Sequence, residues 1–261
     1  MKINITATDK NYIFSDIPLF YVLTMFAVFP LYYDDKFFNI VQAKFSFFMA
    51  STIMALLCVL FAVFFCKELL LNFIRAICSR ETFLLVVFLL LNILSGILSP
   101  YKSTVILGIK NRYNGILLMT LYLFAFIIAL TVKGRNRFME LIRFYAVSST
   151  IVYILAILNF YGVDPLHMYA RSSDQMATIY LSTIGNINFL GTFLCLSLPL
   201  FLYHAIYQKS LLQRIIFSIV TCIGLAAAIV VNSDSMYFGL MLVIVIIICM
   251  RGFNICLANS L

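Results

Sequence analysis

Four cations in two polar stretches of the chain have the chemistry of an anion-binding site. An arginine guanidinium can hold phosphate oxygens with a planar fork of donors, whereas a lysine ammonium acts as a point charge. Two glycines in the first stretch, Gly108 and Gly115, would let the backbone turn closely around such a ligand. The cations are Lys102, Lys110 and Arg112 in residues 99–114, and Arg171 in residues 161–187.

The same cations have a second interpretation. Lysines and arginines near a membrane can contact lipid headgroups, or they can reflect a relaxed distribution of charge between the two sides. The sequence leaves both readings open, because neither stretch contains a complete catalytic or metal-ligand motif.

Acid–base chemistry has one candidate in these stretches. His167 follows Asp164 closely and precedes Asp174, so it could act as a base with a carboxylate that orients it. With a single histidine and no second signature, we interpret His167 as an ordinary loop residue. The seven cysteines contain no CxxC pair, so their spacing does not suggest a metal site, and we expect none. We also expect no cofactor.

The composition sets the class of protein that carries these stretches. Hydrophobic residues make up 64% of the 261-residue chain and charged residues only 11%. The mean hydropathy is +1.07. Soluble domains carry about 25% charged residues, so this chain could not cover its surface in water. The composition predicts an all-α, polytopic membrane protein that forms one transmembrane domain over residues 1–261.

Eight apolar runs are free of Asp, Glu, Lys and Arg and are long enough to cross ~30 Å of hydrocarbon, or nearly so. Such runs must be helical, because lipid offers no partner for backbone polar groups. The predicted spans are Ile17–Tyr33, Phe45–Phe65, Thr82–Leu98, Gly115–Val132, Phe144–Phe160, Phe189–Tyr207, Ile215–Asn232 and Met236–Met250.

The cations in the connecting segments predict the orientation. With the N-terminus in the cytoplasm, 12 Lys and Arg lie inside and 6 lie outside. Both termini are then cytoplasmic, and residues 99–114 and 161–187 are outside loops. Much of the net charge of +8 is therefore a topology signal, and we do not expect a nucleic-acid partner.

Two further features lie toward the cytoplasmic side. Between Glu68 and Ser79, apolar and polar residues alternate at helical spacing, which indicates either a short interfacial helix or an extension of a neighbouring span. His204, near the end of the sixth run, is the only strongly titratable side chain within the runs, and we interpret it as an interfacial anchor rather than a proton relay.

Three stretches resemble motifs of the bacterial O-antigen ligase and O-antigen polymerase family. Leu107–Leu117 is similar to the family's GxxxRYEGL stretch, Tyr161–Pro165 to YGIDP, and Thr183–Gly191 to TxGNPNFLA. Their order and spacing also fit. The resemblance covers roughly Leu94–Leu242, and the three motifs in order carry it, because each alone is weak.

The resemblance implies a multi-span glycosyltransferase of the bacterial inner membrane. Such an enzyme passes a glycan from undecaprenyl pyrophosphate to an acceptor outside the cytoplasmic membrane, without nucleotide sugar or obligatory metal, in polysaccharide biosynthesis for the cell envelope. Arg112 matches the family's motif arginine, with Lys110 beside it, while Arg171 has no motif match. Cations near the departing pyrophosphate would stabilise its negative charge. The resemblance does not identify the glycan or the acceptor, which is itself a glycan, a lipid or a protein.

Two departures from the family qualify this expectation. Asp234 occupies a position where many members have the arginine of an SRGA stretch. The family's outside loop with its catalytic histidine should follow Met250, and the sequence has eleven further residues. His167 does not match that histidine. We therefore expect a truncated or frameshifted member that binds lipid pyrophosphate without turnover, with no catalytic residue identified.

Two other functions remain alternatives. One is a flippase or transporter of lipid-linked glycans or other small solutes. The other is a non-catalytic membrane partner in envelope-glycan assembly. The outside cations and the charge-free runs favour the transferase over an ion-coupled transporter, which usually needs ionisable groups within its spans.

Overall fold

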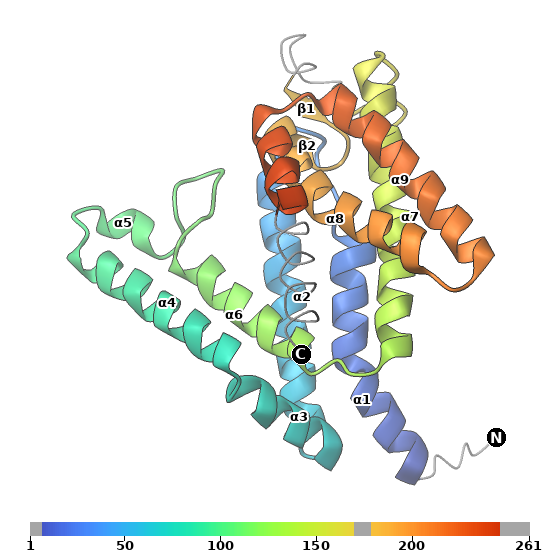
Figure 1. The fold of residues 1–261 in the computed structure, drawn as a ribbon. Coiled ribbons are helices and arrows are strands. Elements are labelled where there is room, and N and C mark those ends of the chain that lie inside the picture. The colour runs from blue at the N-terminus through green and yellow to red at the C-terminus, as the bar shows by residue number, and fades with distance from the viewer. Residues whose placement is uncertain (1–6, 170–178, 246–261) are drawn as a thin grey trace, which may run out of the picture. The chain divides into compact units, whose positions relative to one another are not determined.

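A computed structural model describes residues 7–169 and 179–245 (Figure 1). In these residues the fold is all-helical apart from one short hairpin, as the composition predicts. The elements are α1 (Ala7–Leu23), the π-helix η1 (Thr24–Val28), α2 (Ile40–Ala62), α3 (Lys67–Ile77), α4 (Arg80–Leu98), α5 (Lys102–Val105), α6 (Ile116–Leu130), α7 (Arg135–Phe160), β1 (Tyr180–Leu181), β2 (Gly185–Asn186), α8 (Ile187–Tyr207) and α9 (Leu211–Val231).

Five helices are long and apolar enough to cross a membrane. They are Ile40–Ala62, Arg80–Leu98, Asn136–Phe160, Ile187–Tyr207 and Leu211–Val231. The other three predicted spans coincide with shorter apolar helices, at Asp16–Val28, Ile116–Thr131 and Asp234–Val245. Each of the eight runs therefore contains a helix, and residues 246–250 of the last run lie outside the described residues.

The predicted bounds are wrong mainly at helix starts. The first helix begins at Ala7 rather than Ile17, α2 begins at Ile40 rather than Phe45, and α7 begins at Arg135 rather than Phe144. A search for charge-free runs removes charged end turns, although these continue the same helix. The first helix also ends before the predicted Tyr33, because Pro30 cannot continue its hydrogen bonding.

The chain divides into two compact units by its internal contacts. The first contains residues 1–34 and 41–145, and the second contains residues 35–40 and 146–261. Helix α7 begins in the first unit and ends in the second. Each unit has its own set of buried side chains.

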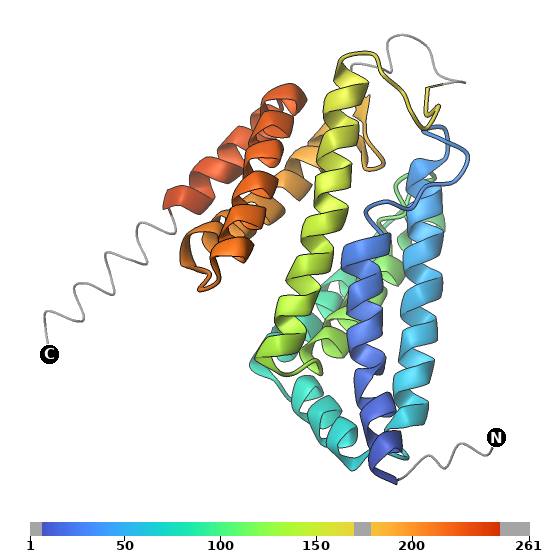
Figure 2. The same cartoon turned by 90° about the vertical axis from the view of Figure 1, so that its right-hand side faces the viewer.

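The core of the first unit forms where α1 packs along α2 (Figure 2). Leu19 and Val22 of α1 lie in one buried cluster with Val59 of α2 and Ile128 of α6. The Tyr21 hydroxyl is hydrogen-bonded to that of Thr52 at 2.8 Å, so the polar groups buried between these helices satisfy each other.

Lys44 ties the start of α2 to the end of the first helix. Its ammonium group donates to the carbonyl oxygens of Phe29 at 2.9 Å, Pro30 at 3.2 Å and Tyr32 at 2.9 Å. These carbonyls follow η1, where helical partners run out. Lys44 is one of the six cations that the sequence places outside. In the fold, its ammonium group caps the C-terminal end of the first helix.

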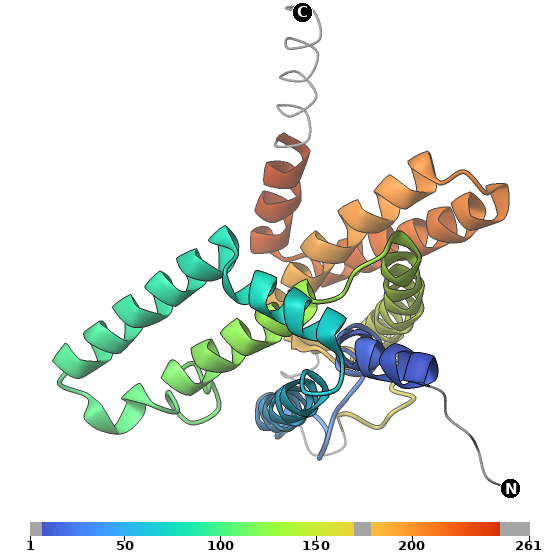
Figure 3. The same cartoon turned by 90° about the horizontal axis from the view of Figure 1, so that it is seen from below.

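Helices α4 and α6 run side by side, with α5 at one end of the pair (Figure 3). They approach closely at Gly96, where a methyl group would lie 2.6 Å from Val105 and 3.0 Å from Ile116. This contact fixes where the loop with the predicted site begins and ends.

In the second unit, α8 and α9 form an antiparallel pair joined by a short turn (Figure 1). Gly224 brings α9 close to Leu198 and to Tyr153 of α7, whose hydroxyl is 2.5 Å from that of Ser197. His204 is 8% exposed and packs on the ring of Phe217 at 5.2 Å. His204 is therefore a packing residue of this unit, and its interpretation as an interfacial anchor rather than a proton relay stays a prediction.

Candidate functional site

The loop between α4 and α6 closes on itself. After the short helix α5, the Gly108 amide donates to the Thr104 carbonyl at 2.8 Å. The Leu117 amide then donates back to the Ile106 carbonyl at 3.0 Å. The two ends of residues 106–117 are thus joined, and we call this segment the cation loop.

Two glycines make this closure possible. A methyl group on Gly108 would lie 2.5 Å from the Asn114 amide nitrogen, and one on Gly115 would lie 2.3 Å from the Ile106 carbonyl oxygen. Gly108 also has a φ of +84°, which L residues rarely adopt. The close backbone turn expected at Gly108 and Gly115 is present, and it forms the neck of the loop.

The tip of the loop is held by backbone hydrogen bonds and an aromatic stack. The amides of Arg112 and Tyr113 both donate to the Ile109 carbonyl, at 3.0 and 3.1 Å. The Tyr113 ring then stacks on Phe45 of α2, with centroids 4.6 Å apart and planes inclined by 10°. The backbone that carries Lys110 and Arg112 is therefore fixed by neighbours that leave the two cationic groups unused.

The three predicted binding cations of residues 99–114 have different surroundings. Lys110 and Arg112 are exposed, and within residues 7–169 and 179–245 their charged groups have no hydrogen-bond or ion-pair partner. The Lys102 ammonium group instead donates to the carbonyls of Gly96 and Ile97. Lys102 thus caps the C-terminal turn of α4, where a cation also suits the helix dipole.

The N-terminus of α6 adds to the positive potential beside the loop. Its N-cap is Gly115, which has no side chain to accept from the first helical amides. Helix N-termini carry about half a positive charge and attract anions. The two free cations therefore precede a helix end that favours the same kind of ligand.

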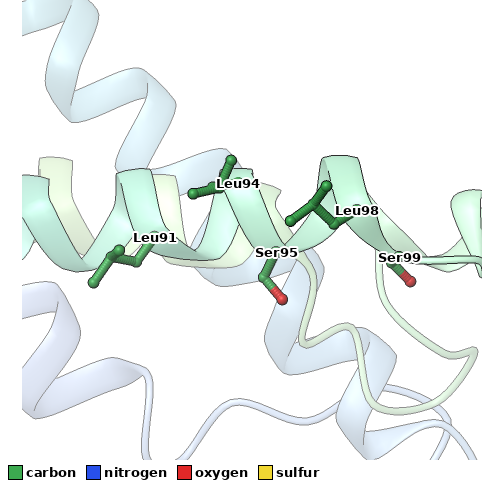
Figure 4. Close-up of a pocket in the computed structure, with 5 residues that line it drawn as sticks. All are labelled: Leu91, Leu94, Ser95, Leu98 and Ser99. Carbon is green, nitrogen blue, oxygen red and sulfur yellow. The ribbon is translucent and has the colours of Figure 1, made fainter.

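A shallow hollow of mixed leucine and serine lining lies on the last turns of α4, just before the cation loop. Its volume is about 550 Å³, and it is lined by Leu91, Leu94, Ser95, Leu98 and Ser99 (Figure 4). Leu98 is 76% exposed, so the surface is open rather than filled by the protein's own side chains. The hollow ends at Ser99, where α4 ends.

The second polar stretch is organised by internal hydrogen bonds. The Asn159 side chain donates to the Val163 carbonyl at 3.1 Å and accepts from the Ser182 amide at 2.9 Å. Asn159 thus ties both ends of the stretch to the last turn of α7. Arg171 and Asp174 lie outside the described residues, so the prediction for Arg171 has no structural description.

The Asp164 carboxylate faces the backbone rather than the His167 ring. One of its oxygens accepts from the Tyr169 amide at 2.9 Å, and the His167 amide donates to the Asp164 carbonyl at 3.2 Å. Burial, together with the nearby negative charge of Asp164, raises the pKa of Tyr169 to about 12. These polar groups therefore hold a turn and do not form an acid–base pair.

The start of α8, in the third stretch that resembles a family motif, contacts the segment that carries Asp234. Asn186 caps the helix, because its side-chain oxygen accepts from the Asn188 amide at 2.9 Å. This leaves the Asn188 side chain to accept from the hydroxyls of Ser233 at 3.0 Å and Ser235 at 3.4 Å. Sequence reasoning noted both stretches but not their contact, which joins residues 45 positions apart.

Comparison with known proteins finds no relative of this chain. No family model matches the chain, and neither curated proteins nor solved structures give a match. A function for this chain therefore has to be argued from the geometry of the cation loop and of the α8 start.

Proposed function

We propose that this chain is an O-antigen ligase-like protein of the bacterial cytoplasmic membrane that binds an undecaprenyl-pyrophosphate-linked glycan on the outer side. The observation that carries the proposal is the cation loop, which presents Lys110 and Arg112, without partners among the described residues, on a backbone held at its neck and tip. In the transfer that the resemblance implies for the family, the glycan passes to an acceptor hydroxyl, which gives up its proton, and the lipid pyrophosphate leaves.

The charge of the ligand fits the loop. A pyrophosphate diester in water is multiply anionic, and both cations can reach it without first breaking an internal ion pair. Because the backbone that carries the two groups is already held at its neck and tip, the loop itself loses little conformational entropy on binding. In a glycan transfer the pyrophosphate gains negative charge as it departs, so the same cations would stabilise the transition state more than the ground state.

The tail of the ligand fits the hollow on α4. A polyprenyl chain is apolar and needs an apolar surface, and the hollow between Leu91 and Ser99 is lined by three leucines. It ends where the segment leading to the cation loop begins. An amphiphile with its tail on α4 and its pyrophosphate at the loop would use both features.

The proposal is tested by binding of undecaprenyl pyrophosphate to the protein in lipid nanodiscs. Arg112→Ala should weaken binding about 5- to 150-fold, which corresponds to about 1–3 kcal/mol for a charge-assisted contact. Arg112→Lys should restore only part of this, because a point charge replaces a fork. Lys209→Ala, at an exposed lysine in the turn after α8, is the matched control and should leave the affinity unchanged.

A second pair of measurements separates binding of the pyrophosphate head group from binding of the polyprenyl tail. Ser95→Phe fills the hollow and should weaken binding of undecaprenyl pyrophosphate, while competition by inorganic pyrophosphate stays as in the unmodified protein. Arg112→Ala should weaken the binding of both undecaprenyl pyrophosphate and inorganic pyrophosphate. Unchanged affinity in Arg112→Ala and Lys110→Ala, or an equal loss in Lys209→Ala, would remove the cation loop from the binding site.

A further inference from the structure

Helix α3 is a separate element rather than an extension of a neighbouring span. It begins after Cys66, whose backbone is extended, and ends at Cys78. Ser79 then caps α4 by accepting from the Thr82 amide at 3.2 Å. Of the two readings that the sequence left open for residues 68–79, the structure has the short independent helix.

The side chains of α3 form three stripes. The first faces the protein: Leu69 and Ala76 are 2% and 4% exposed, and Leu69 packs with Ala62 and Cys66. The second is apolar and exposed, at the spacing of one helix face. It consists of Leu70, Ile74 and Ile77, which are 37%, 46% and 46% exposed.

The third stripe is polar and basic at its edges. It contains Glu68, Asn72 and Arg75, and Lys67 begins the helix. Within the described part of the chain, the charged groups of Lys67 and Arg75 have no partner. The Asn72 side-chain oxygen accepts from Lys133 at 2.6 Å, which brings a third cation to this stripe.

We propose that α3 lies in the plane of the membrane surface and binds anionic phospholipid. Its exposed apolar stripe lies among the acyl chains, and Lys67, Arg75 and Lys133 lie at the phosphate groups. A helix that contacts protein, hydrocarbon and water at once needs one face for each of them, and the three stripes of α3 supply these faces. On the orientation expected from the cation count, this is the cytoplasmic leaflet. The inference does not depend on pyrophosphate binding.

Lipid accounts for the apolar stripe better than a protein partner does. The neighbouring start of α4 continues the same kind of surface, with Phe83 64% and Leu84 59% exposed. A membrane helix of this kind has lipid as its solvent. The unpaired cations at the edge then meet the layer of negative charge that anionic lipids supply, at a gain of about fivefold in lipid preference per cation.

The absence of tryptophan from the chain allows a direct test. Ile74→Trp and Glu68→Trp each place a single indole on the apolar or the polar stripe. In nanodiscs with phosphatidylcholine brominated on its acyl chains, Ile74→Trp should be strongly quenched and blue-shifted. Glu68→Trp is the matched control and should be red-shifted and weakly quenched. Equal quenching at the two positions, or an unquenched Ile74→Trp, would overturn the proposed placement.

The preference for anionic lipid is measured with the bromine on one lipid at a time. In mixed nanodiscs of phosphatidylglycerol and phosphatidylcholine, Ile74→Trp should be quenched more by brominated phosphatidylglycerol. Adding Arg75→Gln should reduce this preference about fivefold, and adding Arg75→Glu should reduce it further. Binding of anionic lipid would be contradicted if Ile74→Trp with Arg75 intact showed no preference for phosphatidylglycerol. It would also be contradicted if this preference were the same with Arg75, Arg75→Gln and Arg75→Glu.

Discussion

The two polar stretches predicted as outside loops use their side chains in opposite ways. In the cation loop, backbone contacts and an aromatic stack hold the fold, and Lys110 and Arg112 have no partners in the part of the chain that the structure describes. Between α7 and α8, side chains such as Asn159 and Asp164 hold the backbone themselves. A loop held by its backbone can offer charged side chains to a ligand, whereas a loop held by its side chains has already used them.

This contrast also separates what substitutions should do. In the cation loop, glycine changes should disrupt the fold and cation changes should affect binding alone. In the second stretch, the polar residues should carry stability. The division therefore predicts an order of effects, with the largest at the neck of the cation loop.

The largest effect should come from Gly108→Ala. Its new methyl group meets the Asn114 amide nitrogen at 2.5 Å, in a left-handed backbone conformation. We expect a loss of about 2–5 kcal/mol, which combines the left-handed penalty and the overlap. Gly162→Ala is the matched control, since Gly162 has a φ of +78° with nothing within 4 Å. It should cost only about 1–2 kcal/mol in unfolding by SDS in mixed micelles. Equal costs would show that the neck is not close-packed.

Asn159→Ala should have the next largest effect. Asn159 is 6% exposed, and its loss leaves the Ser182 amide without the Asn159 oxygen and the Val163 carbonyl without the Asn159 amide. We expect a loss of about 1–3 kcal/mol in the same unfolding experiment, because buried polar groups without partners are costly. Asn92→Ala removes an amide that bonds only to its own helix, at the Phe88 carbonyl, and should change stability by less than about 0.5 kcal/mol. A comparable loss in both variants would contradict the assignment of Asn159 as the tie of this stretch.

Substitutions of two cations in residues 99–114 should separate an effect on stability from an effect on binding. Lys102→Met removes the group that donates to the Gly96 and Ile97 carbonyls, and should lower stability by about 0.5–1 kcal/mol. Arg112→Met removes a group with no partner in the described chain, and should change stability by less than about 0.5 kcal/mol while weakening pyrophosphate binding. The reverse pattern would mean that Arg112, not Lys102, holds the fold.

The sequence predicts the helices of this chain better than its polar contacts. Apolar runs locate the helices because hydrocarbon and protein interior both exclude charge. The ends of α1, α2 and α7 could not be located this way, since their charged turns belong to the same helices. The glycine neck was also foreseeable, because two glycines that flank a short stretch with four polar residues and a tyrosine indicate a close backbone turn.

The roles of individual cations could not be predicted from their positions. Lys44, Lys102 and Arg112 all count as outside cations, yet only Arg112 is without a partner in the described fold. Whether a lysine reaches a helix end depends on where that helix stops, which sequence patterns give only within a few residues. The contact of Asn188 with Ser233 depends in turn on how α8 and α9 pack, and no local pattern encodes that.

The smallest effect should be a pH dependence that belongs to the second stretch. The pKa of Tyr169 is raised to about 12 by burial and by Asp164, and its hydroxyl donates to the Tyr180 carbonyl at 2.5 Å. In the unfolded chain a tyrosine has a pKa of about 10, so the unfolded chain loses this proton first as the pH rises. The stabilising contribution is therefore present in full below about pH 10 and is lost progressively between about pH 10 and about pH 12. Tyr169→Phe should be less stable than the unmodified protein at about pH 9, and the difference should shrink at about pH 11. Tyr101→Phe, at a 74% exposed tyrosine before α5, is the control and should change stability by less than about 0.5 kcal/mol. If the Tyr169→Phe difference is constant across this range, Tyr169 does not couple the fold of the second stretch to protons, and Asn159 alone would remain as its main tie.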